Sequence, residues 1–299
     1  MINDFLQYIR YEKNYSAHTV LSYENDLSAF CQFLNISQED FCPATVEATH
    51  IREWVVSLMQ KKQSARTIAR KISTLKSFWK YLIKNSLAAK NPALKIILPK
   101  TKKPIPVFFK EKEVEAVIDD PFVPSNFNNI RDLLIIELMY MTGIRLSELI
   151  GIRDSEVNLV QRELRVTGKR NKQRVVPLTE ELCKKIQHYI DIRNQLNGHD
   201  TVSLLVRVNG KSLYPGLVYR IVKRRMSVVS SLAHVSPHVM RHSFATAMLN
   251  GGADINSVKV LLGHSSLAAT QVYTHSGFNE LHNIYKQAHP RAKFKKEVI

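Results

Sequence analysis

Residues 129–149 read NIRDLLIIELMYMTGIRLSEL, and this stretch decides how the second part of the chain folds. Apolar residues dominate from Asn129 to Met141, which predicts a buried helix. Gly143 ends that helix, because glycine readily adopts the left-handed conformation found after helix C-termini. Arg145 then precedes a further predicted helix, where an arginine can face an anion together with the helix N–H groups. Glu148, three residues later, can orient its guanidinium.

The sequence that follows predicts two short hairpins among helices. Residues 162–166 and 173–177 alternate apolar and polar side chains around a Gly/Asn turn, which is typical of a β-hairpin. Thr179 is positioned to cap the next helix. Residues 203–208 and 211–213 surround an Asn-Gly pair and predict a second hairpin. Helices continue to the end, so we expect a mainly α fold with small β-hairpins.

The first part of the chain is predicted to be all helical. Ser16 and Ser64 are candidate N-caps, and Thr49 opens another helix. Prolines at positions 92, 99, 104 and 106 then favour extended chain. We therefore expect two domains, with a helical domain over residues 1–89, a basic proline-containing linker over 90–107 and a second domain over 108–299.

The positive charge of the protein is concentrated in one segment. The 299 residues carry a formal net charge of +17, with 43 Lys and Arg against 26 Asp and Glu. Residues 54–110 contain 14 of these basic residues and no acidic residue. A surplus of this size indicates a polyanionic partner such as nucleic acid. Its confinement to one segment indicates a defined binding surface.

Residues 64–85 within this segment predict an amphipathic helix. One face is apolar, and its basic residues include Arg66, Arg70, Lys76, Lys80 and Lys84. A solvated face is the ordinary explanation of a charged row. However, solvated helices usually mix signs to form pairs four residues apart, and this helix has no acidic residue. We therefore expect these five residues to bind DNA.

Several classes of protein do not fit the sequence. No apolar run reaches the length of about 18 residues that predicts a membrane span, and the N-terminus lacks a signal-peptide pattern. The cysteines, Cys31, Cys42 and Cys183, are too few and too widely spaced for a disulfide framework or a C-x-x-C metal site. We expect a cytoplasmic protein without membrane insertion.

Two further segments could carry chemistry. A helix would place His238, Arg241 and His242 on one face. Such a face could bind phosphate, hold part of a metal site or be ordinary surface; the metal hypothesis lacks the glutamate of H-E-x-x-H, because Val239 stands there. The second segment, residues 261–275, holds His264 and Tyr273. A lone tyrosine is more often a packing residue than a nucleophile.

Taken together, these segments resemble the tyrosine recombinase (phage-integrase-type) family, Xer branch. The matching stretches, in order, are TGIRLSEL from residue 142, TGKRNKQRVVPL from 167, SPHVMRHSFAT from 236 and LLGHSSLAATQVYTH from 261. Residues 64–82 and the closing IYKQAHPRA also match. The resemblance covers essentially the whole chain, and its departures at Arg170 and Ser243 touch no catalytic position.

The resemblance implies a fold and a set of roles. It implies an N-terminal SAM-like core-binding helical bundle and a C-terminal α+β catalytic domain. The implied catalytic residues are Arg145, Lys169, His238, Arg241, His264 and Tyr273. Tyr273 would form a 3′-phosphotyrosyl link to DNA, and the arginines would neutralise the phosphate. His238 would be the general base, Lys169 would protonate the leaving 5′-oxygen, and His264 would hydrogen-bond the phosphate. No metal and no cofactor are implied.

The family also implies partners and a cellular role. It implies a homo- or hetero-tetramer on double-stranded DNA, formed with a paralogous recombinase, in which residues 278–299 dock on a neighbouring subunit. A division-associated activator is possible within this scheme. The implied role is resolution of chromosome dimers at cell division. The alternatives are a mobile-element integrase, a type IB topoisomerase, a non-catalytic architectural DNA-binding protein and a metal hydrolase using His238 and His242.

Overall fold

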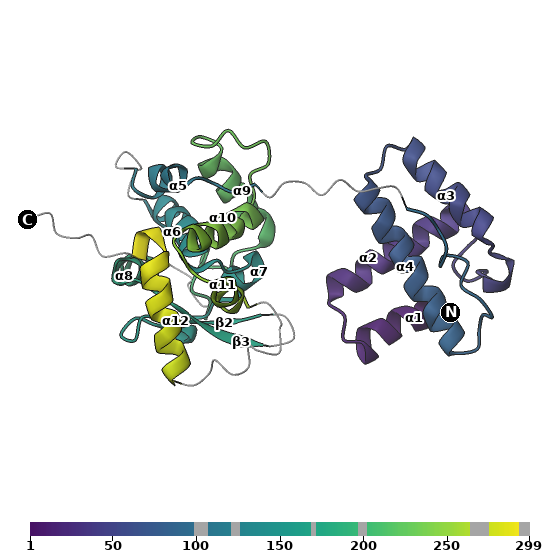
Figure 1. Cartoon of the computed structure of the whole chain (residues 1–299), viewed down its shortest axis with the longest axis horizontal. Coiled ribbons are helices and arrows are strands. Elements are labelled where there is room, and N and C mark those ends of the chain that lie inside the picture. The colour runs from purple at the N-terminus through teal and green to yellow at the C-terminus, as the bar shows by residue number, and fades with distance from the viewer. Residues whose placement is uncertain (99–106, 121–125, 169–171, 197–201, 264–274, 293–299) are drawn as a thin grey trace, which may run out of the picture. The chain divides into compact units, whose positions relative to one another are not determined.

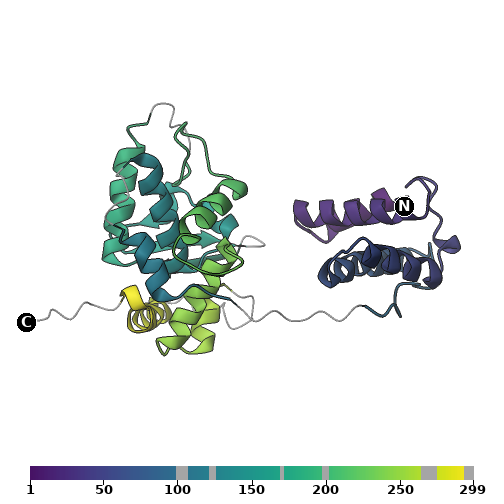
Figure 2. The ribbon, with the colours of Figure 1, turned by 90° about the horizontal axis from the view of Figure 1, so that it is seen from above.

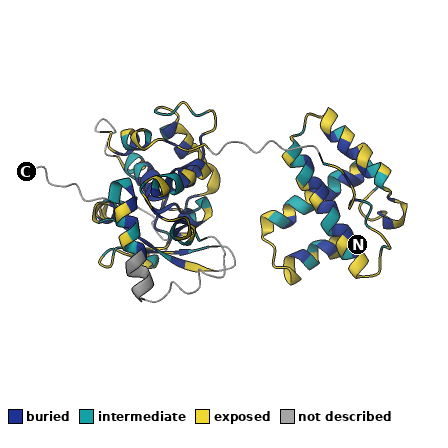
Figure 3. Ribbon diagram, viewed as in Figure 1, coloured by how far each residue is buried: buried dark blue, intermediate teal, exposed yellow. Residues whose placement is uncertain are grey.

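The computed structural model describes residues 1–98, 107–120, 126–168, 172–196, 202–263 and 275–292 (Figure 1). The chain divides into two compact units, Met1–Pro104 and Ile105–Ile299, each with its own hydrophobic core. Figure 3 colours the ribbon of each unit by burial, and buried residues lie mainly on the inward-facing parts of the helices while exposed residues lie outside. The described chain is mainly helical with one small sheet, which confirms the predicted fold class.

The first unit is all helical, as predicted. Its helices are α1 (Ile2–Gln7), α2 (Ala17–Phe33), α3 (Ala48–Gln60) and α4 (Ala65–Lys84), with a π-helical turn over Tyr8–Glu12 and a 3-10 turn over Pro43–Thr45. Ser16 and Ser64 cap α2 and α4, since their side chains accept the N–H groups of Thr19 and Thr67. The third helix starts one residue before Thr49, with Glu47 as its N-cap. Aromatic side chains, including those of Phe30 and Trp54, fill the core.

The stretch predicted as linker begins inside this first unit. Ala93 and Ile96 are buried in its core. The Asn91 side-chain amide donates to the carbonyl of Lys76, 3.2 Å away, and its oxygen accepts the N–H of Ala93. The segment around Pro92 therefore still packs within the first unit. The turn around it places apolar side chains back against α4, an outcome that the proline pattern did not predict.

The second unit surrounds one buried helix. This helix, α6 (Phe127–Thr142), contacts α5 (Glu111–Ile118), α8 (Glu180–Arg193) and α10 (Pro237–Asn250). The remaining helices are α7 (Leu146–Gly151), α9 (Pro215–Met226), α11 (Ile255–Leu261) and α12 (His275–Ala288), and Thr179 caps α8 as predicted. Burial of α6 on nearly all sides explains why its sequence is almost continuously apolar.

A three-stranded antiparallel sheet, in the order β1-β2-β3, covers one side of this unit. It contains β1 (Val157–Asn158), β2 (Glu163–Thr167) and β3 (Gln173–Pro177), and the β2–β3 pairing confirms the first predicted hairpin. The second predicted hairpin is shorter than expected. Val206 forms an antiparallel bridge with Ser212, and the N–H of Arg207 donates to the carbonyl of Lys211 at 2.8 Å, whereas Ser203 bridges Arg153.

The described C-terminal residues pack within their own unit. Helix α12 contacts α10, α11 and β3, and its yellow ribbon lies against the second unit in both Figure 1 and Figure 2. Leu281, Tyr285, Ala288 and His289 are buried, and Arg291 pairs with Asp119 at the end of α5. The apolar residues of this segment that the structure describes face the core of their own unit, and the expectation that residues 278–299 dock on a neighbouring subunit stays a prediction. Within the described ranges, no helix has the length and apolar content needed to cross a membrane.

Candidate active site

Two features of the structure explain why a glycine follows α6. Gly143 has a φ of 60°, a conformation in which a side chain is strained, and its N–H donates to the carbonyl of Met139. A Cβ at this position would also lie 2.3 Å from the ring of Phe244. The break turns the chain so that α7 starts at once, with Arg145 as its N-cap. This confirms the predicted helix, its end at Gly143 and the position of Arg145 just before the next helix.

Glu148 holds Arg145, as the spacing predicts. One carboxylate oxygen accepts the backbone N–H of Arg145 at 2.8 Å, and the other accepts its Nη1 at 2.7 Å. The glutamate side chain is 2% exposed, whereas the arginine side chain is 38% exposed. The buried carboxylate therefore fixes a guanidinium that still reaches the surface.

Arg174 on β3 is a second partner of Glu148, and sequence reasoning missed it. Its two terminal nitrogens donate to the two carboxylate oxygens at 3.0 and 2.9 Å, while Nε donates to the carbonyl of Leu261 at 2.8 Å. The missed signal was strand alternation, since Arg174 shares a face with the buried Val176. Burial alone would raise the pKa of Glu148, but Arg174 and Arg145 outweigh it and lower that pKa to about 2.

Arg241 links the C-terminal ends of two helices. Ser236 caps α10, which places Arg241 in its second turn. The guanidinium is buried and donates to the carbonyls of Gly143 and Leu262, each at 2.6 Å. These carbonyls follow α6 and α11, where helices leave backbone acceptors unpaired and carry partial negative charge. Burial, together with the charges of Arg145 and Arg174, lowers the pKa of Arg241 to about 10, so it stays protonated at neutral pH.

Three arginines thus bind three consecutive carbonyls. Arg174 binds the carbonyl of Leu261, Arg241 that of Leu262, and Arg145 that of Gly263, the last at 3.4 Å. We call Arg145, Arg174, Arg241 and Glu148 the arginine cluster. In the described part of the chain, Glu148 is the one carboxylate bonded to these arginines. Three positive charges against one negative charge make a site suited to an anion with several oxygens, such as a phosphodiester.

His238 and His242 lie beside the arginine cluster on α10. Their rings are 4.7 Å apart and perpendicular, and both residues are exposed. Partial desolvation of the ring against the protein lowers the pKa of His238, and the charges of His242, Arg241 and Arg145 lower it further. The ring is therefore neutral at neutral pH and can accept a proton. Within the described residues, no three His, Cys, Asp or Glu side chains gather as metal ligands would.

The three other predicted catalytic residues, Lys169, His264 and Tyr273, lie outside the described residues. The chain nevertheless leaves the described part next to the arginine cluster. A Cβ on Gly168 would lie 3.2 Å from a carboxylate oxygen of Glu148, and a Cβ on Gly263 would lie 3.0 Å from Arg174. The residues that precede Lys169 and His264 are therefore both neighbours of the cluster.

The predicted DNA-binding residues lie along α4 in the first unit. Arg66, Arg70, Lys80 and Lys84 are exposed, and Lys76 is half-buried. Arg70 differs from the others because it pairs with the buried carboxylate of Asp26, which also binds Lys71 at 3.0 Å and the hydroxyl of Thr74 at 2.9 Å. Lys84 lies over the ring of Tyr8, with its nitrogen 5.4 Å from the ring centre. The charge of Arg70 is thus partly offset within the fold.

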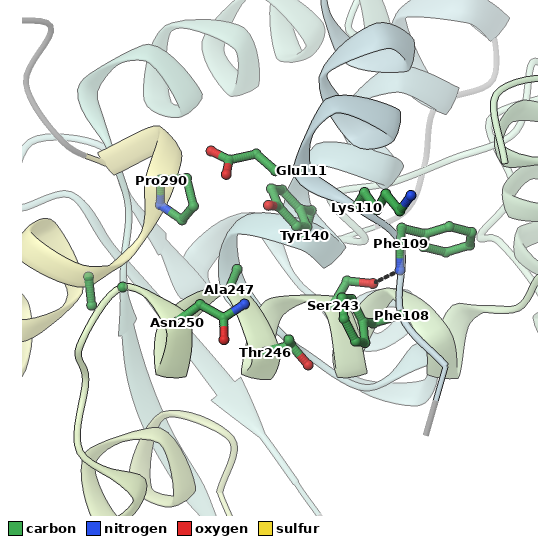
Figure 4. A pocket seen from close by; sticks show the side chains of 12 residues that line it. Phe108, Phe109, Lys110, Glu111, Tyr140, Ser243, Thr246, Ala247, Asn250 and Pro290 are labelled. Atoms are coloured by element: carbon green, nitrogen blue, oxygen red, sulfur yellow. Dashed lines mark hydrogen bonds between the residues drawn. The ribbon is translucent and has the colours of Figure 1, made fainter. Parts of the chain in front are cut away.

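A pocket of about 290 Å³ lies on another face of α10, and Figure 4 shows its lining. The side chain of Ser243, a position where the sequence departs from the family pattern, accepts the N–H of Phe109 at 2.8 Å there. Of the predicted catalytic residues that the structure describes, Arg145, His238 and Arg241, none lines this pocket. Its walls are Phe108, Phe109, Lys110, Glu111, Tyr140, Ser243, Thr246, Ala247, Asn250, Gly251, Ala288 and Pro290. The site that the motifs predict is therefore the arginine cluster and not this pocket.

Solved structures of similar fold include DNA recombinases. The XerH site-specific recombinase bound to palindromic difH substrate in a post-cleavage complex aligns with a TM-score of 0.70 and 19% identity, covering 95% of this chain and 83% of that one. The Tn1549 transposon integrase in complex with transposon right end DNA aligns with a TM-score of 0.68 and 21% identity, covering 93% and 97%. At these identities the likeness shows that the fold is shared.

Sequence comparison goes further. The pattern of the phage integrase family matches residues 107–280, and that of the phage integrase N-terminal SAM-like domain matches residues 2–86. Tyrosine recombinase XerC of Anoxybacillus flavithermus is 38% identical, covering 97% of this chain and 98% of the relative. Tyrosine recombinase XerD of Staphylococcus epidermidis is 36% identical, covering 98% and 99%. The chain therefore belongs to the phage integrase family, and within it to the Xer-type tyrosine recombinases.

Proposed function

We propose that this protein is a site-specific DNA recombinase that cuts and rejoins strands through a 3′-phosphotyrosyl link to Tyr273. The observation that carries the proposal is the arginine cluster, in which oriented guanidiniums bind the end of α11 just before the segment that holds His264 and Tyr273. A non-catalytic DNA-binding protein has no need of buried arginines held in this way. Relatives at 36–38% identity over nearly the whole chain carry the name tyrosine recombinase.

In the proposed reaction, the arginines neutralise the phosphate. Attack on a phosphodiester places additional negative charge on the nonbridging oxygens of the transition state. Arg145 and Arg241 would bind those oxygens, because guanidinium N–H groups match the geometry of phosphate. Glu148 and the helix-end carbonyls hold both side chains before the substrate arrives. This preorganisation is the main way in which a protein accelerates phosphoryl transfer.

In the covalent step, one proton leaves the attacking oxygen and another is added to the leaving oxygen. The Tyr273 oxygen would form a bond to phosphorus and give its proton to His238, whose neutral ring is a suitable base. The bond from phosphorus to the 5′-oxygen would break, and Lys169 would protonate that oxygen to leave a free 5′-hydroxyl. His264 would hydrogen-bond the phosphate. The link keeps the energy of the broken bond, so rejoining needs neither ATP nor a metal.

The first unit would supply affinity for the duplex. Arg66, Arg70, Lys76, Lys80 and Lys84 would contact DNA phosphates from α4, because phosphate contacts by cations dominate affinity for DNA. The proposed domain limits are residues 1–89, 90–107 and 108–299, with the linker joining two DNA-facing domains. A tetramer of this chain, alone or with a paralogue, would hold two DNA sites for strand exchange, with residues 278–299 contacting a neighbour.

The proposed cellular role is resolution of chromosome dimers at cell division, in the cytoplasm. The names of the sequence relatives, XerC and XerD, favour this role over that of a mobile-element integrase. Sites of covalent attachment across the host genome distinguish the two. A single chromosomal site supports the proposed role, whereas the ends of a mobile element support the alternative.

The test traps covalent protein–DNA complexes in host cells and sequences the attached DNA ends. A nicked duplex carrying the recovered site is then incubated with wild-type protein, Tyr273→Phe and the matched control Tyr219→Phe, which alters an exposed tyrosine of α9. We expect adducts from the wild type and from the control. The Tyr273→Phe variant is expected to bind the duplex normally and to form no adduct.

Three results would contradict the proposal. An adduct formed by Tyr273→Phe would show that another residue is the nucleophile. Absence of any adduct from the wild type on the recovered DNA, with binding intact, would favour an architectural DNA-binding protein. Relaxation of supercoiled DNA that lacks the site would indicate a topoisomerase.

A further inference from the structure

We infer that Arg174 is a positioning residue for the proposed cleavage reaction, acting through Glu148 and the end of α11. The inference rests on the proposed function. Arg174 lies within the stretch TGKRNKQRVVPL, but none of the catalytic roles implied by the family resemblance falls on it. Arg174 does not face the surface as Arg145 does, since its side chain is 10% exposed against 38%. Its effect on DNA must therefore pass through the groups that it holds.

The first of these groups is the carboxylate of Glu148. Arg174 binds both oxygens, and those same oxygens bind the backbone and side chain of Arg145. Without Arg174, a buried carboxylate would keep one cationic partner and an incomplete set of hydrogen bonds. Such a carboxylate is costly to keep ionised. Arg145 would then lose the fixed acceptor that orients it.

The second group is the backbone next to the predicted catalytic segments. Nε of Arg174 binds the carbonyl of Leu261, while the next carbonyl binds Arg241. A Cβ on Gly263 would lie 3.0 Å from Nη1 of Arg174, and one on Gly168 would lie 3.9 Å from the same nitrogen. Arg174 thus lies between the backbone that precedes Lys169 and the backbone that precedes His264. One side chain joins α7, β3 and the end of α11.

This arrangement predicts how the carboxylate titrates. The charged groups that act on Glu148 are Arg145 from α7, Arg174 from β3 and Arg241 from α10. With all three present, the pKa of Glu148 is about 2, so the carboxylate is ionised across the useful pH range. Removing the strongest partner raises that pKa, because burial then acts against fewer cations. Loss of Arg174 should therefore add an acid limb to the pH dependence of cleavage.

The experiment is a double-mutant cycle on the full-length protein. It measures single-turnover adduct formation on the nicked duplex at saturating protein, from pH 5.5 to 8.5. The variants are Arg174→Gln, Arg174→Lys, Glu148→Gln and the double variant Glu148→Gln/Arg174→Gln. The matched control is Arg165→Gln, which removes an exposed arginine from the neighbouring strand. Duplex affinity is measured in parallel.

We expect Arg174→Gln to slow adduct formation by about 10- to 100-fold, the range for residues that act through another group, with duplex affinity within about threefold of wild type. Arg174→Lys should recover part of the rate. In the Glu148→Gln background, removing Arg174 should cost less than about threefold, because the two side chains act as one unit. The added acid limb of Arg174→Gln should disappear in the double variant.

Two outcomes would overturn the inference while leaving the proposed function intact. One is an Arg174→Gln rate equal to that of wild type. The other is a double variant whose loss equals the product of the two single losses, with no pH dependence added by Arg174→Gln. If Arg174→Gln does not fold, Arg174→Lys completes the same cycle with the charge retained. An inactive wild type would instead contradict the proposed function itself.

Discussion

The two units share one arrangement of charged side chains but place it in different surroundings. In each, a buried carboxylate binds two cations, of which one is exposed and the other buried. Asp26 binds Arg70 and Lys71, whose side chains are 45% and 10% exposed. Glu148 binds Arg145 and Arg174, at 38% and 10%. The pattern of ion pairs is therefore similar at the two places.

What differs is the surroundings of the exposed arginine. Arg70 lies on α4 among other exposed cations, where phosphate contacts add to affinity. Arg145 lies beside Arg241, the ends of α6 and α11, and the neutral ring of His238. The first arrangement suits binding along a polyanion, and the second suits stabilisation of charge at one phosphate. The comparison teaches that burial of the neighbours, and not the number of cations, separates a binding surface from a reaction site.

The largest expected effect comes from the buried side of the comparison. Arg241→Lys keeps the charge but cannot bind the carbonyls of Gly143 and Leu262 and a phosphate at once, because it lacks the planar fork of arginine. We expect adduct formation to slow by about 10²- to 10³-fold, with duplex affinity nearly unchanged. Single-turnover cleavage of the nicked duplex measures this. A loss of affinity as large as the loss of rate would erase the distinction between the two units.

The next largest effect is expected on stability, from a change in the backbone next to the arginine cluster. Gly143→Ala introduces a side chain at a φ of 60° and a Cβ 2.3 Å from Phe244, so we expect a loss of about 2–4 kcal/mol in the free energy of unfolding. Gly151→Ala is the matched control, since a Cβ there meets no atom within 4 Å. Urea unfolding compares the two variants. Equal stability would mean that the break does not depend on glycine.

A smaller effect is expected from the exposed side. The combined variant Arg66→Gln/Lys80→Gln/Lys84→Gln should weaken duplex binding and reduce the slope of log affinity against log salt by about 0.9 for each lost phosphate contact. The rate of adduct formation at saturating protein should stay near wild type. Lys184→Gln, which alters a lysine that is 74% exposed on α8, is the control. An unchanged salt slope would exclude α4 from the DNA contact.

The smallest effect concerns pH. Since the pKa of His238 is lowered from 6.5, the base stays neutral at neutral pH, and the rate should fall only below pH 6.5. Glu148, with a pKa of about 2, contributes no limb in this range. His242→Gln removes a charge that lowers the pKa of His238, so its acid limb should move to higher pH. A shift to lower pH, or none, would contradict the role of the neighbouring ring.

Much of the molecule could be predicted from sequence because local signals were strong. The caps at Ser16, Ser64 and Thr179 were visible, and so were the break at Gly143 and the β2–β3 hairpin. Each depends on residues close together in the chain, which propensity and spacing can describe.

The remaining features depend on contacts between distant segments. In the sequence, Arg174 is one more basic residue near a turn. It becomes part of the site because β3 pairs with β2 beside α7 and the end of α11. Asp26 lies 44 residues before Arg70 and pairs with it, so it offsets a charge that the sequence of α4 alone would assign to DNA binding. The second hairpin is shorter than predicted, and its Ser203 bridges the distant Arg153. Burial and long-range pairing decided these cases.

The most direct test measures adduct rate and salt dependence together. Wild type, Arg241→Lys and the combined α4 variant are compared on the same nicked duplex, across a series of salt concentrations, for both affinity and single-turnover rate. We expect Arg241→Lys to change the rate and keep the salt slope, and the α4 variant to change the slope and keep the rate. If both variants changed the same quantity, the proposed division between a binding surface on α4 and a reaction site at the arginine cluster would be wrong.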